Sequence, residues 1–173
     1  MSPEPVAVTI RLYQPTDQAQ VEWLYARTPP AGQVAWRPMT LPAELGHIPN
    51  TFARFWVASE PIPQGEAIVG MAAVADADLA IGAPVPEFLA TTEPTARMHY
   101  VRVAPERWRQ GIGRRLVMTA VEWARECGYR AVILDTTPEQ AAAVALYEAT
   151  AFAEAGRTRL GAYELIWFRL TAS

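Results

Sequence analysis

The sequence predicts one α/β domain over residues 1–173, with a mixed, mostly antiparallel sheet and helices on both faces. Three observations lead to this fold class. Apolar residues make up 51% of the chain and charged residues 19%, as is usual for a globular protein. A length of 173 residues is enough for one sizeable core. Segments of strand and helix character alternate, and one strand–helix–strand unit adds a parallel pair to an otherwise antiparallel order.

The first half of the chain combines one clear helix with three strands. Thr16 or Asp17 can cap that helix. Residues 28–50 contain five prolines and two glycines, so we expect mostly loop there, with a short helix near 42–46. A turn at 61–65 separates two of the strands. The expected elements are a strand at 8–13, a helix at 18–27 and strands at 52–59 and 67–75.

The second half begins with a long connection, residues 76–96, which is rich in proline and glycine and contains a short helix near 87–90. Connections longer than about 15 residues are uncommon unless they serve a function. Apolar periodicity then predicts a strand at 97–103, a helix at 111–127, a strand at 131–134, a helix at 139–150, and a closing hairpin of strands at 152–159 and 163–170.

The composition of the chain limits which classes of partner and which cellular location we expect. The net charge of −3 does not indicate a nucleic-acid partner. No apolar run approaches the ~20 residues that span a bilayer, and the N-terminus lacks the features of a secretory signal, so we expect no membrane association. Cys127 is the single cysteine, which excludes an internal disulfide and fits a reducing, cytoplasmic location. No residue cluster has metal-ligand spacing. The oligomeric state stays open, a homodimer included.

A strand, a basic glycine-containing loop and a helix follow one another over residues 101–117. The first amides of a helix have no partner within it, and the helix dipole adds positive potential at that end. Glycine lets a ligand approach the backbone, so a phosphate can dock there. The expected binding residues are Arg109, Gln110, Gly111, Ile112, Gly113 and Arg114, with added charge from Arg107 and Arg115. The alternative is a tight turn with solvated arginines.

Two familiar phosphate motifs do not fit this loop. A dinucleotide fingerprint needs a glycine where the chain has Leu116, and a triphosphatase loop needs a lysine, which the chain lacks. The segment 108–113, Trp-Arg-Gln-Gly-Ile-Gly, resembles instead the acetyl-CoA pyrophosphate loop of the GCN5-related N-acetyltransferases (GNAT), Gln/Arg-x-x-Gly-x-Gly/Ala. Trp108 departs from that pattern, and we expect Arg107 and Arg109 to supply the missing donor.

A second motif extends the resemblance to residues 8–170. Residues 139–152 resemble the family's late helix, Asn-x-x-Ala-x-x-Leu-Tyr-Glu-x-x-Gly-Phe. Gln140 stands at the asparagine position. Ala151 replaces the glycine, which matters only where the backbone needs a positive φ.

The resemblance implies a fold in which two central strands splay apart and the pantetheine arm of acetyl-CoA lies between them. Main-chain groups of Val101, Arg102 and Val103 would pair with that arm as an added strand does. Gln140 would join the cofactor-binding residues. Tyr147 matches the family's proton donor to sulfur, and a buried tyrosine that packs its helix is the alternative.

The base that takes a proton from the acceptor amine is less clearly marked. Lysine-acetylating members often carry a glutamate where this chain has Arg97, and arylalkylamine acetyltransferases carry a histidine at the position of His99. Strand alternation would place His99 on one face with Arg97 and Val101. An imidazole pKa of about 6.5 suits proton removal, directly or through water. A structural histidine is the alternative, and Glu93 is a second candidate base.

The sequence therefore indicates an acetyl-CoA-dependent N-acetyltransferase that acts by direct transfer to a primary amine of a small molecule or peptide. The competing interpretations are a non-catalytic acyl-CoA-binding regulatory module and a structural domain whose arginine-rich turn binds nothing. The acceptor site is expected to involve residues 28–50, residues 76–96 and the terminal hairpin, with aromatic residues drawn from Trp36, Trp56, Trp167 and Phe168.

Overall fold

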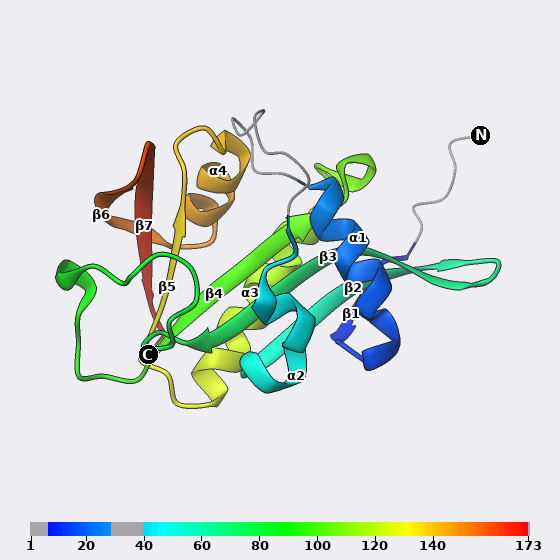
Figure 1. Ribbon diagram of the computed structural model, residues 1–173, viewed down its shortest axis with the longest axis horizontal. Coiled ribbons are helices and arrows are strands. Elements are labelled where there is room, and N and C mark those ends of the chain that lie inside the picture. The colour runs from blue at the N-terminus through cyan, green and yellow to red at the C-terminus, as the bar shows by residue number, and fades with distance from the viewer. Residues whose placement is uncertain (1–6, 29–39, 173) are drawn as a thin grey trace.

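Seven strands form one sheet in the order β1-β2-β3-β4-β5-β7-β6 (Figure 1). The computed structural model describes residues 7–28 and 40–172. The strands are β1 (Thr9–Leu12), β2 (Arg54–Ile62), β3 (Gly65–Asp76), β4 (Thr95–Val103), β5 (Ala131–Thr136), β6 (Ala153–Leu160) and β7 (Tyr163–Thr171). Only the β4–β5 pair is parallel among the neighbouring strands described. The predicted mixed, mostly antiparallel sheet is confirmed.

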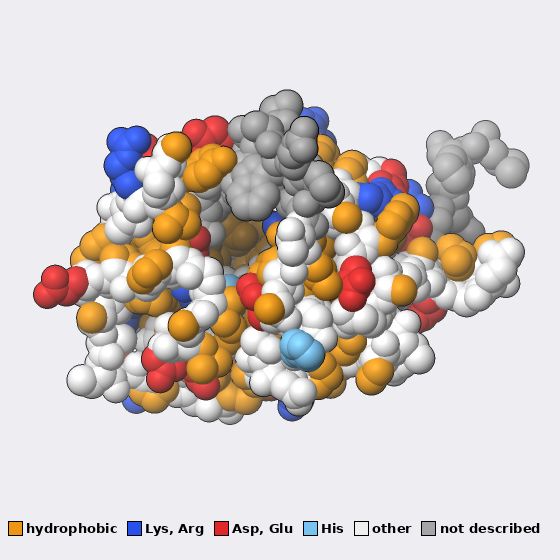
Figure 2. Space-filling view, in the orientation of Figure 1, with side chains coloured by type: hydrophobic (Ala, Val, Ile, Leu, Met, Phe, Trp, Pro, Cys, Tyr) orange, Lys and Arg blue, Asp and Glu red, His pale blue; other side chains and the backbone are white. Residues whose placement is uncertain are grey.

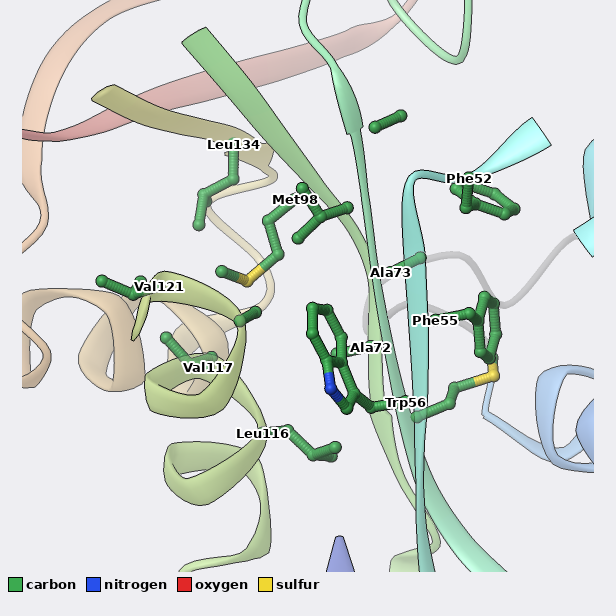
Figure 3. Packing of buried hydrophobic residues seen from close by; sticks show 14 of the residues in the cluster. Phe52, Phe55, Trp56, Ala72, Ala73, Met98, Leu116, Val117, Val121 and Leu134 are labelled. Atoms are coloured by element: carbon green, nitrogen blue, oxygen red, sulfur yellow. The ribbon is translucent and has the colours of Figure 1, made fainter. Parts of the chain in front are cut away.

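Helices cover both faces of this sheet, as predicted. They are α1 (Gln18–Arg27), α2 (Ile48–Thr51), α3 (Ile112–Glu126) and α4 (Ala141–Ala149). Figure 1 places α1 and α2 in front of the sheet and α3 behind it. Successive residues of β2 point to opposite faces, so Phe55 lies on one side and Trp56 on the side of α3 (Figure 3). On the α3 side, α4 packs Tyr147 against Phe168 of β7.

The apolar stripe of α3 anchors that helix to the sheet. Its buried residues recur with helical spacing and are 2% exposed or less: Ile112, Leu116, Val117, Ala120, Val121 and Ala124. Burial of one leucine or valine stabilises the fold by about 1.5–3 kcal/mol, so this stripe fixes where α3 begins. The start of α3 is the part of the helix that later matters for the site.

The chain before β2 is more helical than the sequence indicates. A 3-10 helix, Ala43–His47, lies where a short helix was expected, but α2 follows it directly. Pro49 lies in the first turn of α2, where its missing N–H and fixed φ are tolerated. A proline-rich segment predicts loop, but proline also suits the start of a helix.

The long connection between β3 and β4 packs over β5, β6 and β7. Ala83 and Leu89 from this segment form a second core with Ile133, Leu165 and Trp167. A 3-10 helix at Glu87–Leu89 presents Phe88 to β6, where a Cβ on Gly156 would lie only 2.7 Å from the ring. Glycine at 156 therefore permits a close approach between the connection and β6.

The two central strands diverge soon after they meet. β4 and β5 pair at three positions only, Thr95 with Ala131, Ala96 with Val132 and Arg97 with Ile133. Beyond this point β4 continues to Val103 and β5 to Thr136 without pairing with each other. The predicted splay is confirmed, and it leaves the β5-facing edge of β4 open.

Ala151 occupies a backbone conformation that favours glycine. Its φ is +68°, and it follows α4 at the point where the Phe152 amide donates to the Tyr147 carbonyl, closing the helix. We expect Ala151→Gly to raise the free energy of unfolding by about 0.5–1 kcal/mol, because relief of left-handed strain outweighs the added entropy of the unfolded chain. Urea denaturation measures this. Ala145→Gly inside α4 is the control and should lower stability by about 1 kcal/mol. Destabilisation by Ala151→Gly would contradict the account.

Candidate active site

A cleft of about 910 Å³ lies where β4 and β5 separate. Its size is typical of ligand sites in proteins. Residues of β4, the start of α3, the end of β5 and the first turns of α4 line it, together with Ile81 and Gly82 from the long connection. Figure 2 shows the hollow near the middle of this face, where the surface is mainly hydrophobic.

One end of the cleft carries a run of backbone amides without partners. Within residues 7–28 and 40–172, no group accepts a hydrogen bond from the amides of residues 109–114. Positive φ angles at Arg109 (+60°) and Gly111 (+77°) turn the chain into α3. Successive free amides and the helix dipole together make an anion-binding concavity. The expected residues of this loop line the cleft, apart from Gln110, which is exposed outside it.

The arginines around this turn have separate roles. Arg109 and Arg114 line the cleft. Arg107 also reaches it, but its guanidinium is held by Glu60 through two hydrogen bonds, of 2.7 Å from Nε and 2.9 Å from Nη2. Arg115 lies in a different depression, between β1 and α3. The local positive charge available to a ligand therefore comes mainly from Arg109 and Arg114.

Trp108 supplies its own hydrogen bond at the position where a glutamine or arginine was expected. Its indole Nε1 donates to the Val103 carbonyl at 2.8 Å, although the side chain is 61% exposed. This contact fixes the turn against the end of β4. Arg107 pairs with Glu60, so of the two arginines expected to replace the missing donor, Arg109 is the one without an ion pair in the described part of the chain. The indole of Trp108 occupies the Val103 carbonyl. The β5-facing edge of β4 at Val101, by contrast, has no strand partner.

A β-bulge re-aims the side chains of β4. His99 pairs with Ala73 and Arg102 with Met71, so two residues of β4 oppose one of β3. Tyr100 has a φ of +53° at this bulge. The bulge breaks the simple alternation assumed from the sequence.

Side-chain contacts confirm the change of face. Tyr100 packs against Tyr25 of α1, and the Arg102 guanidinium lies 4.7 Å from the centroid of that same ring. His99 lies next to Tyr100, with ring centroids 6.2 Å apart. Val103, by contrast, lies on the opposite face, where it approaches Gly113 of α3. His99 therefore does not share a face with Val101, which precedes Val103 by two residues on the regular part of the strand.

His99 is a poor match for the base that the sequence indicates. Burial and the nearby charge of Arg97 lower its pKa to about 3, far from the assumed value of about 6.5. Its Nε2 is buried and has no hydrogen-bond partner in the described part of the chain. The imidazole is thus neutral near pH 7 and holds a proton too weakly to accept one efficiently from an alkylamine.

This low pKa predicts a pH dependence of stability. Below about pH 6.5 the unfolded chain binds a proton at His99 that the folded protein does not bind until pH 3 is approached, so stability falls as the pH falls. The slope from one such group is at most about 1.4 kcal/mol per pH unit. His99→Gln should reduce the loss of stability between pH 7 and pH 5 in urea titrations. The exposed His47→Gln is the control. An unchanged acid dependence in His99→Gln would contradict the low pKa.

Arg97 ties the long connection to the sheet. Its Nη1 donates to the carbonyls of Ile81 (2.9 Å) and Ala83 (2.7 Å), and Nη2 donates to Asp135 at 2.6 Å. The guanidinium carbon lies 4.9 Å from the Trp167 ring centroid, and the side chain is 2% exposed. Because these groups satisfy most of the buried charge, Arg97 is a structural anchor for the wall of the cleft.

Tyr147 both packs its helix and reaches the cleft. Its ring lies 5.9 Å from the ring centroids of Phe152 and Phe168. Burial and the negative charge of Asp135 raise the pKa of its hydroxyl, while the nearby Arg102 partly offsets this. The phenol therefore stays protonated and can act as a hydrogen-bond donor in the cleft. The two interpretations of Tyr147, a proton donor to sulfur and a residue that packs its helix, are therefore compatible.

The other expected cofactor-binding residues lie around the same cleft. Gln140 lines it just before α4, and its Nε2 donates to the Thr137 hydroxyl at 3.3 Å. Arg102 donates to the Thr28 carbonyl, so its guanidinium is engaged with the end of α1. Glu93, the second candidate base, is exposed near Arg169 and does not line the cleft.

The aromatic residues expected around the acceptor are placed differently. Trp56 packs against Trp123, and Trp167 lies beneath Arg97, so both belong to the core. Trp36 lies outside the described residues. No described residue of the terminal hairpin lines the cleft, whereas the rings of His99 and Tyr100 do. The bulge in β4 produces this change, and nothing in the local sequence pattern marks it.

Asp135 is a charged cleft residue that the sequence analysis does not single out. It follows the apolar strand segment 131–134, is hydrogen-bonded to Arg97 and lines the same cleft as Tyr147. The only signal available is a carboxylate placed directly at the end of a buried strand. Among the described residues, no group of three or more His, Cys, Asp or Glu side chains is arranged to hold a metal ion.

Comparisons with known proteins agree with this architecture. Residues 18–152 match the sequence model of the acetyltransferase (GNAT) family. The chain is 31% identical to human N-acetyltransferase 8 over 155 residues, which is 87% of this chain and 60% of that protein. Rat N-acetyltransferase family 8 member 3 is 32% identical over 139 residues, covering 78% of this chain and 54% of that protein. The chain thus spans little more than half the length of these relatives.

A solved structure shares the fold. The putative acetyltransferase yncA from Salmonella typhimurium, determined with its cofactor acetyl-CoA, superposes with a TM-score of 0.70 at 19% identity, over 96% of this chain and 95% of that one. At this identity the likeness concerns the fold. In the described part of this chain, none of the helices has the length and apolar character needed to cross a membrane.

Proposed function

Because the chain belongs to the GNAT acetyltransferase family, we propose that it transfers an acetyl group from acetyl-CoA directly to a primary amine of a small molecule or peptide. The observation that carries the proposal is a single cleft with free amides at residues 109–114 toward one end and Tyr147 farther along it. Anion binding and hydrogen-bond donation to sulfur are the two functions that a thioester of CoA requires from its site.

The cofactor-binding part of the proposal follows the free groups of the cleft. The amides of 109–114, with Arg109 and Arg114, would hold the pyrophosphate. The open edge of β4 at Val101 would pair with the pantetheine amides as an added strand does. Gln140 would contact the same arm from the start of α4.

The chemical part assigns one residue to the leaving group. Tyr147 would donate its hydroxyl hydrogen to the sulfur as the carbon–sulfur bond breaks. A main-chain amide on the open edge of β4 would donate to the carbonyl oxygen as it gains negative charge. His99 is too weakly basic for the role suggested by the sequence, so we assign loss of the amine proton to water in the cleft.

We place this reaction in the cytoplasm, since the exposed thiol of Cys127 and the absence of any other cysteine suit a reducing compartment. The test is incubation with acetyl-CoA and a panel of amino acids, polyamines and peptides, with detection of free thiol and of the acetylated product. Thiol release that depends on an added amine supports the proposal. Saturable CoA binding without thiol release from any amine would instead favour the non-catalytic acyl-CoA-binding module.

A further inference from the structure

Asp135 stands at the end of β5, where the walls of the cleft separate. Its Oδ1 accepts the hydrogen bond from Arg97, while no donor in the described part of the chain reaches Oδ2. The side chain is 23% exposed and lines the cleft. Among the described lining residues, the only other carboxylate is that of Glu139, which is exposed in the turn before α4. Asp135 is therefore the carboxylate in the interior of the cleft.

Arg97 bonds one oxygen of Asp135 and leaves the other oxygen without a donor in the described part of the chain. Arg97 is almost fully buried, and the carbonyls of Ile81 and Ala83 fix the other arm of its guanidinium. The guanidinium thus engages one oxygen of the carboxylate, and the second carboxylate oxygen is left for a ligand. Arg97 orients the carboxylate, because two carbonyls and one carboxylate oxygen hold the planar group in place.

Two buried nitrogens nearby also lack partners. The Nε of Arg97 and the Nε2 of His99 are buried without a hydrogen bond in the described part of the chain. Buried polar atoms in proteins are almost always satisfied by protein, ordered water or ligand. Both residues line the cleft with Asp135, so this part of the cleft is built to hold polar groups.

Asp135 lies within electrostatic reach of the hydroxyl of Tyr147, because its charge acts on that hydroxyl. Both residues line the same cleft, so a cation held at Asp135 would share the cleft with the group that we assign to the leaving sulfur. Such a cation would be placed at the reacting end of the cleft and away from the anion-binding amides at residues 109–114.

We propose that Asp135 is the acceptor-binding residue and that it selects amines that arrive as ammonium ions. This inference rests on the proposed function and specifies its substrate class. The free carboxylate oxygen accepts a hydrogen bond from the ammonium group, which holds the nitrogen near Tyr147. One proton then leaves the nitrogen for water before the neutral amine forms its bond to the acetyl carbon.

The test compares two probes of similar shape and different charge on the CoA-saturated protein, by calorimetry at pH 7. Benzylamine is an ammonium ion at this pH, and O-benzylhydroxylamine is neutral. The wild-type protein should bind the ammonium probe at least about tenfold more tightly. Asp135→Asn keeps an oxygen for Arg97 and removes the charge, so it should lose this preference and leave affinity for the neutral probe unchanged. Glu139→Gln is the matched control and should bind both probes as the wild type does.

Equal binding of the two probes to the wild-type protein, or an ammonium affinity unchanged in Asp135→Asn, would overturn the proposal. Asp135→Glu retains the charge and should keep the preference, which covers the case in which Asp135→Asn folds poorly. Titration of CoA alone is measured separately and is repeated with each variant. If the wild-type protein does not bind CoA, the proposed function is rejected. The two probes are then titrated into the free protein, which tests separately whether Asp135 binds the ammonium ion.

Discussion

Tyr147→Phe should lower kcat by roughly 10²–10⁴-fold while CoA affinity stays close to the wild-type value. The substitution removes one hydroxyl and keeps the ring between Phe152 and Phe168, so the packing of α4 should survive. CoA affinity should be preserved because the amides of residues 109–114 lie at another part of the cleft. Steady-state kinetics with detection of free thiol measure the first effect, and calorimetry with CoA measures the second.

Tyr129→Phe is the control for this prediction, since the Tyr129 hydroxyl bonds Asp76 outside the cleft. The loss in Tyr147→Phe should shrink for acyl donors whose leaving thiol is more acidic, because they need less help from a hydrogen-bond donor. Wild-type turnover in Tyr147→Phe would mean that the tyrosine only packs its helix. It would also favour the non-catalytic interpretation.

Gly111→Val should weaken CoA binding by at least about tenfold, or 1.4 kcal/mol. The φ of Gly111 is +77°, which a β-branched residue adopts only with strain, and its position faces open space where a ligand would approach the amides. The variant both distorts the turn and places side-chain atoms in the anion-binding concavity. Calorimetric titration with CoA measures the change.

Gly161→Val is the matched control, because Gly161 also has a positive φ (+58°) and open space but lies in the turn between β6 and β7. It should cost a similar amount of stability and leave CoA affinity unchanged. Equal CoA affinity in Gly111→Val and the wild type would place the anion site elsewhere. Equal losses in both glycine variants would indicate a general effect of strain.

Much of the fold follows from local periodicity. The helix at Gln18–Arg27 was predicted at its observed bounds, and the helix expected at 111–127 is found as α3, Ile112–Glu126. The α2 helix was missed because a proline-rich segment can also start a helix. The packing of the long connection could not be read from sequence, since it depends on the close contact of Phe88 with Gly156 across the chain.

The site was predictable where one segment forms it and much less so where several segments meet. The loop at 109–114 and the position of Tyr147 follow from two local motifs. The lowered pKa of His99 disfavours a role as base, and it could not be predicted because its burial and the nearby charge of Arg97 are set by tertiary structure. Asp135 was missed for the same reason. Its importance comes from Arg97 and Tyr147, which belong to other elements.

The central claim is that acetyl-CoA lies in the cleft between β4 and β5 with its pyrophosphate on the start of α3. A crystal structure of the protein with CoA tests this most directly. The account predicts phosphate oxygens on the amides of residues 109–114, the pantetheine along the open edge of β4, and the sulfur within hydrogen-bond reach of the Tyr147 hydroxyl. CoA bound outside this cleft, or in it with the sulfur remote from Tyr147, would contradict the account.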